Sequence, residues 1–158
     1  MPVPNLLQIG ASGANRLKEG NRTEADRLTS LRLALVVVGV AFIVGIYTFI
    51  KIWPSGWSWH TGQALPHYLQ MILGVYATLG VFLLLASRNP LAHVSLIRFT
   101  VWSSVVHAGI MGVQALAHTD HRGHLWGDVP LLFLMAAVLA LLLPRGAAAK
   151  SASQGTSP

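Results

Sequence analysis

Histidines give this chain its widest range of possible chemistry, and three of them lie within residues 118–124. His118, His121 and His124 are spaced by three residues, so one helix edge or one turn would hold all three. Neutral imidazole is a common ligand for Zn²⁺ and Cu²⁺, and three imidazoles leave one position open. With His60 from the neighbouring loop they form a candidate divalent-metal site. A titration with Zn²⁺ that shows no saturable binding would overturn this hypothesis.

A second chemistry open to the histidines is cofactor binding. His67 and His118 fall at similar depth, near the ends of two apolar stretches, which suits two axial ligands of a haem. His107 lies about 16 Å from His118 at the rise of a helix, so it does not share that plane. His67, His107 and His118 are therefore the cofactor candidates, and haem ranks below a divalent metal. The alternative is that these imidazoles lie among lipid headgroups and bind nothing.

The apolar stretch around His107 also carries a polar stripe. The steps from His107 to Met111, Gln114 and His118 are four, three and four, which is helical spacing. Lipid cannot satisfy such groups, so this face is expected to point into a bundle and pair with a similar face on the preceding span. The predicted interhelical stripe comprises Gln70, Thr78, Ser103, Ser104, His107 and Gln114.

Composition places the elements that carry these residues in a membrane. The 158 residues are 53% hydrophobic and 10% charged, with a mean hydropathy of +0.56. The net charge of +6 comes from basic residues in tails and short loops, which favours a lipid bilayer rather than nucleic acid as partner. The chain has no cysteine, which excludes disulfides and thiolate metal sites.

The hydrophobic runs predict the fold class: all-α, an integral membrane four-helix bundle with short loops. We expect spans at about 31–52, 67–87, 94–117 and 128–144, within a membrane domain of residues 23–145. Asp128 is expected to cap the fourth span. Residues 1–22 and 146–158 are expected to form disordered tails.

Two kinds of residue are expected to fix the depth of the bundle. Trp53, Trp57 and Trp59 follow the first span closely and indicate an interfacial aromatic belt, with a substrate-binding aromatic patch as the alternative. Arg98 lies close enough to the start of the third span for its side chain to reach the headgroups.

The distribution of basic residues predicts the orientation. Arg and Lys are concentrated before the first span, between the second and third, and after the fourth. The positive-inside rule then places both termini in the cytoplasm, with the chain crossing a bacterial inner membrane several times.

Several runs resemble a family of small, uncharacterised four-span bacterial membrane proteins. They are 53–57 (WPSGW), 70–77 (QMILGVYA), 88–93 (RNPLAH) and 99–107 (FTVWSSVVH), and the resemblance extends over about 31–144. It implies the four-span fold but no activity. The layout is also similar to that of the DoxX group, some of whose members are linked to quinone redox chemistry.

Three functions remain open at this point. The sequence contains no recognised catalytic motif, so a non-enzymatic bundle or a subunit of a membrane complex is favoured, with a membrane-protein partner or a second copy of the chain. The first alternative is a metal- or haem-binding redox subunit with histidines on the outer face. The second is an oligomeric small-molecule transporter, against which stands the position of all five acids in tails or at interfaces. Whether the chain is an enzyme stays undecided.

Overall fold

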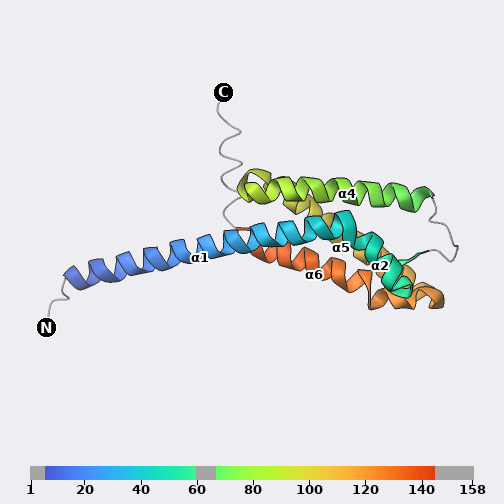
Figure 1. Cartoon of the computed structure of the whole chain (residues 1–158). Helices are drawn as coiled ribbons and strands as arrows, with labels where there is room; N and C mark the ends of the chain where they lie inside the picture. Colours follow the sequence, from blue (N-terminus) through green and yellow to red (C-terminus); the bar gives the residue numbers. More distant parts are fainter. Residues whose placement is uncertain (1–5, 60–66, 145–158) are drawn as a thin grey trace, which may run out of the picture.

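The computed structural model describes residues 6–59 and 67–144, with side chains described from residue 18 on. In these ranges the chain is helical and forms no strand. Four of its helices are long and apolar enough to cross a membrane. The protein is therefore a multi-pass, all-α membrane bundle, as the hydrophobic runs predicted (Figure 1).

The first span is one long helix with a defect near its end. Helix α1 (Leu6–Val40) passes into a π-helical turn, η1 (Ala41–Gly45), and then into α2 (Ile46–Ile52). The backbone is right-handed helical at the junctions, so the helix bends without breaking. In Figure 1 the bend directs α2 away from the axis of α1, toward the short helix α3 (Pro54–Trp57). Such turns are rare and often lie at functional sites.

The N-terminal segment differs from its expected form. We expected a disordered tail through residue 22, but α1 already begins at Leu6 and projects beyond the other helices (Figure 1). Once the membrane span has nucleated a helix, each further turn adds hydrogen bonds without a new nucleation step. The C-terminal tail expected at 146–158 lies outside the described residues.

The remaining spans alternate in direction. They are α4 (His67–Arg88), α5 (Val94–Ala117) and α6 (Asp128–Leu142), with the 3₁₀ turns η2 (Pro90–His93) and η3 (Thr119–Leu125) before α5 and α6. Helix α5 packs most extensively on α6, and α4 packs on α1. One end of the bundle carries Arg27, Arg32, Arg88 and Arg98, and we name it the arginine end. The other carries His118, His121 and His124 and is the histidine end.

The arginine end contains the hydrophobic core. Leu31 and Leu35 of α1, Leu83 of α4, Ile97 of α5 and Leu139 of α6 are all fully buried and belong to one cluster. Together they come from all four spans, so this cluster joins the whole bundle. Arg27 adds a polar link, because its guanidinium donates hydrogen bonds to the carbonyl oxygens of Leu141, Leu142 and Leu143 at the end of α6.

Two glycines let α1 and α4 approach closely. A Cβ added at Gly80 would lie 2.6 Å from the carbonyl oxygen of Gly39, and one at Gly39 would lie 2.9 Å from that of Gly80. Only a residue without a side chain fits at either position. Nothing in the apolar run of the first span singles out Gly39, and only the crossing of the two helices reveals its role.

The start of the fourth span also corrects an expectation. Gly127, not Asp128, is the residue that flanks α6, and no side chain caps the helix there. Asp128 lies in the first turn and is only 6% exposed. Its carboxylate faces other partners, which belong to the site described next.

Candidate functional site: an aromatic cavity at the histidine end

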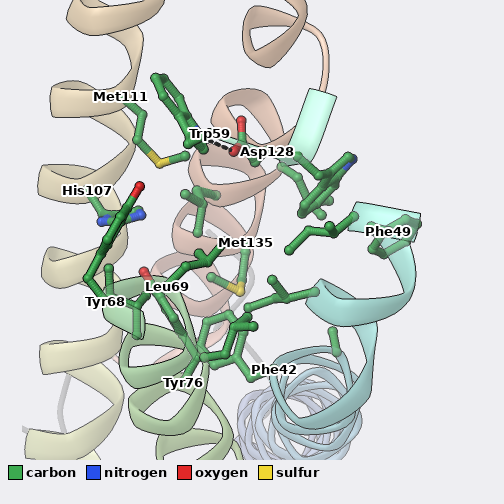
Figure 2. A pocket seen from close by; sticks show the side chains of 18 of the residues that line it. Phe42, Phe49, Trp59, Tyr68, Leu69, Tyr76, His107, Met111, Asp128 and Met135 are labelled. Carbon is green, nitrogen blue, oxygen red and sulfur yellow. Dashed lines mark hydrogen bonds between the residues drawn. The ribbon is translucent and has the colours of Figure 1, made fainter. Parts of the chain in front are cut away.

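The bundle is hollow toward the histidine end. A cavity of about 380 Å³ lies between η1, α2, the Trp57–Trp59 segment, α4, α5 and α6. Its body is apolar and includes Phe42, Ile46, Leu73, Leu132 and Met135. Figure 2 shows His107 and Met111 on one side of this space, Phe49 on the other, and Trp59 with Asp128 near one end. The volume suits a small organic molecule.

The π-helical turn helps to create this cavity. Ala41 and Phe42 in η1 and Ile46 just after it all line the space. The bend moves α2 off the axis of α1, so the close packing seen at the arginine end does not continue along the first span. Phe42 is buried and contacts Tyr76 of α4 edge to face, with ring centroids 4.9 Å apart. This pair separates the packed core from the hollow half.

One acidic side chain faces the cavity. Asp128 accepts a hydrogen bond from Trp59 Nε1 at 2.9 Å, and its two oxygens lie 3.0 and 3.1 Å from His124 Nδ1. His124 is 1% exposed, so this is a buried carboxylate–imidazole pair. Burying such groups is costly unless they are paired, and here each supplies the other's partner. Asp128 is the first residue of α6 and is buried against these partners, and the expectation that it lies at a membrane interface stays a prediction.

Trp59 closes this end of the cavity. Its ring stacks on His124, with centroids 3.9 Å apart, and also on His121 at 4.9 Å. Together with its hydrogen bond to Asp128, these contacts attach the loop after the first span to η3 and α6. Trp59 is thus held by two neighbouring rings and one carboxylate.

Glycines make the contact between the two loops possible. A Cβ at Gly123 would collide with the backbone of Ser55, and one at Gly127 would collide with the backbone of Gly56. The segment around α3 therefore lies directly against η3, backbone to backbone. This contact holds Trp57 and Trp59 in place over the cavity.

Trp57 brings an unsatisfied donor to the wall. Its Nε1 is buried and has no hydrogen-bond partner in the described part of the protein, while its ring stacks on Phe49 at 4.7 Å. A buried N–H without an acceptor is costly, so the Trp57 indole is an unpaired polar group in this part of the bundle. Tyr68, Tyr76, His107 and Gln114 supply further polar groups to the wall.

Of the predicted cofactor candidates, His107 reaches the cavity. It lines the cavity beside Tyr76, with ring centroids 5.8 Å apart. His67 and His118 are both exposed, at the start of α4 and just after α5. Cofactor binding by these three residues stays a prediction.

The predicted metal ligands lie beside one another but face different partners. The ring centroids of His118 and His121 are 6.1 Å apart, and those of His121 and His124 are 5.9 Å apart. In residues 6–59 and 67–144, no group of three possible ligands is arranged to hold a metal ion. His60 lies outside the described residues, so the four-histidine metal site stays a prediction.

The predicted polar stripe is divided by the structure. On α5, Thr100 and Ser104 are buried and His107 faces the cavity, but the Thr100 and Ser103 hydroxyls donate to carbonyls of their own helix. On α4, Gln70 and Thr78 are exposed, and Thr78 likewise donates to Gly74. Hence the α4 residues that face α5 across the cavity are aromatic and apolar ones, Tyr68, Leu69 and Tyr76.

The predicted interface anchors also separate into two groups. Trp53 is exposed, as a belt residue would be, and so is Arg98 near the arginine end. Trp57 and Trp59 instead line the cavity. For them both expectations, the interfacial belt and the substrate-binding aromatic patch, stay predictions. The signal that distinguishes them from Trp53 is the pair of glycines, Gly123 and Gly127, that lets the facing loop approach.

These features define the class of protein: a four-span helical membrane bundle with an aromatic cavity that carries one buried acid. A family model matches residues 25–157, and the chain belongs to that family, a family of unknown function (DUF6632). The match includes every element that lines the cavity. No curated protein and no solved structure matched the chain.

Proposed function

We propose that this protein is a non-enzymatic membrane-embedded binding protein that takes a small, largely apolar molecule from the bilayer. The observation that carries the proposal is the cavity, with an apolar body and an aromatic end that carries one acid. Pockets with this combination of apolar wall and a few directed polar groups are typical ligand sites.

Entry from the lipid side fits the exposure of the wall. Phe49, Tyr68, Ile72 and Leu131 line the cavity, and each is also exposed on the surface of the bundle. Surface residues of apolar spans face lipid, so the cavity extends to the bilayer side of the bundle. An apolar molecule could reach it without crossing the polar headgroup layer.

The setting of this activity is a proposal too. The basic residues support insertion in a bacterial inner membrane with both termini in the cytoplasm, since Arg27, Arg32, Arg88 and Arg98 share one end of the bundle. A C-terminal alkaline phosphatase fusion should then be inactive and a cytoplasmic reporter at the same position active. The reverse pattern would overturn the orientation. A membrane-protein partner or a second copy of the chain would fit the same setting.

The binding proposal is tested by filling the cavity. Leu132→Trp places an indole in the cavity wall, whereas Leu134→Trp adds the same group on the same helix at a position that is 60% exposed. Each protein is purified from its native membrane in a mild detergent and denatured, and the released molecules are quantified by mass spectrometry.

We expect an apolar compound in near-stoichiometric amount from the wild type and from Leu134→Trp, and its loss from Leu132→Trp. The same set of compounds at the same amounts in all three proteins would mean that the cavity does not bind them.

A further inference from the structure

The charge of the cavity wall narrows the class of ligand, and this inference rests on the proposed function. Among the nineteen lining residues that belong to the described ranges, Asp128 is the only Asp or Glu, and none is Lys or Arg. His107 is the only basic type among them. The partner of Asp128, His124, is not part of the wall. With a neutral His124 the formal charge presented to a bound molecule is that of one carboxylate, whereas a protonated His124 would cancel it.

Aromatic rings surround the same space. Six lining residues are aromatic: Phe42, Phe49, Trp57, Trp59, Tyr68 and Tyr76. The face of an aromatic ring carries negative charge density, so it attracts a cation and repels an anion. Trp59, which donates to the carboxylate, brings one of these rings directly next to the acid (Figure 2).

Burial strengthens both effects. Asp128 is 6% exposed, and much of the wall is hydrocarbon, so little water screens the charge. An apolar anion such as a fatty acid would meet a carboxylate and aromatic faces with no Lys or Arg to pair with. An apolar cation would meet a carboxylate and a wall that contains aromatic side chains.

We propose that the cavity selects lipophilic cations: molecules with an apolar or aromatic body and one positive charge, which would lie next to Asp128 and Trp59. Selectivity would come from the single acid and the rings, while affinity would come from the apolar wall. Asp128 would then have two tasks, since it also holds Trp59 in place.

The test uses probes that differ mainly in charge. Tetraphenylphosphonium and tetraphenylborate carry the same four phenyl rings with opposite charges, and triphenylphosphine oxide is a neutral relative. Full-length protein in lipid nanodiscs is equilibrated with each probe by dialysis at about pH 8, where an unperturbed imidazole is neutral. Site binding is the saturable part that Leu132→Trp removes.

Two matched variants test whether the charge of Asp128 causes the preference for a cation. Asp128→Asn removes the charge but keeps an oxygen that can accept the Trp59 hydrogen bond. Asp120→Asn removes the same charge from the same end of the bundle, at an exposed position in η3 that does not line the cavity.

We expect the phosphonium to bind about tenfold more tightly than the borate in wild type and in Asp120→Asn. In Asp128→Asn this preference should largely disappear. A preference that persists in Asp128→Asn would overturn the role of the acid. If that variant fails to fold, the comparison of the two charged probes on the wild type still decides whether the site is selective for cations.

The remaining outcomes separate this inference from the proposed function. Saturable binding of the phosphine oxide with no preference for the cation would overturn cation selectivity and leave a neutral-ligand site. Absence of any binding that Leu132→Trp abolishes would overturn cation selectivity, while the proposed function is decided separately by the compounds released from the purified protein.

Discussion

The two halves of the bundle use the same four helices in different ways. At the arginine end, fully buried leucines and Ile97 fill the space between the spans, and Gly39 and Gly80 bring two backbones into contact. At the histidine end the same helices surround a cavity, and aromatic and polar side chains join the aliphatic ones in its wall. The change occurs at η1, where the first span bends.

This contrast separates residues that hold the fold from residues that shape a site. The packed half keeps the helices in register, so the hollow half can remain open without collapsing. The hollow half has its own attachment, in which Asp128, His124 and Trp59 join the loops at the histidine end. Loss of the packing at the arginine end and loss of the Asp128 contacts at the histidine end should therefore have different effects on the protein.

Loss of the Asp128 side chain should have the largest effect. Asp128→Ala leaves His124, which is buried, and the Trp59 indole N–H without their partner. Each orphaned buried polar group costs about 1–3 kcal/mol. We expect the thermal unfolding midpoint in detergent, followed by tryptophan fluorescence, to fall well below that of Asp128→Asn. Equal midpoints would mean that the acid does not hold this end together.

The next largest effect should come from the glycine contact at the packed half. In Gly80→Ala the new Cβ would lie 2.6 Å from the Gly39 carbonyl oxygen and 2.8 Å from Ile43, so α1 and α4 must separate. Overpacking of this kind costs about 1–3 kcal/mol. The matched control is Gly74→Ala on the same helix, where nothing lies within 4 Å of the added atom. Its midpoint should stay level or rise, because Ala favours helix over Gly. A control as unstable as Gly80→Ala would point to helix propensity instead of contact.

The two halves also differ in how far the sequence predicts them. The spans follow directly from the lengths of the apolar runs, and α4 (His67–Arg88) and α5 (Val94–Ala117) correspond to the stretches expected at 67–87 and 94–117. The cavity does not follow from those runs, because it depends on a π-helical turn within the uniformly apolar 41–45 stretch. It also depends on α4 packing on α1, whereas the polar residues of the second and third spans suggested that those two would pair.

The third prediction concerns Arg27, which the sequence presents only as one of several basic residues before the first span. Its guanidinium reaches three carbonyl oxygens at the end of α6 and so joins the first and last spans. Lysine keeps the charge but lacks the planar fork that makes several bonds at once. We expect Arg27→Lys to lower the stability by about 1 kcal/mol, the typical value of one hydrogen bond. Thermal unfolding of the wild type and Arg27→Lys at the same ionic strength measures this loss of stability. Unchanged stability would mean that Arg27 contributes only its charge to the orientation of the protein in the membrane.

The smallest effect is expected at Arg98, which has the same charge at the same end of the bundle. Arg98 is exposed on α5, one turn into the helix, where its side chain can extend toward headgroups. Lysine can do the same, so Arg98→Lys should change neither expression nor the unfolding midpoint, with a stability change within about 0.5 kcal/mol of zero. The comparison with Arg27→Lys is made in one lipid and one buffer. It distinguishes an arginine whose planar guanidinium makes several hydrogen bonds from one that contributes only its positive charge. A loss at Arg98 as large as that at Arg27 would mean that this guanidinium holds a specific planar partner, such as an anionic lipid headgroup or a neighbouring protein. Repeating the measurement in nanodiscs with and without anionic lipid then distinguishes the two, because only a lipid partner would make the difference depend on the bilayer.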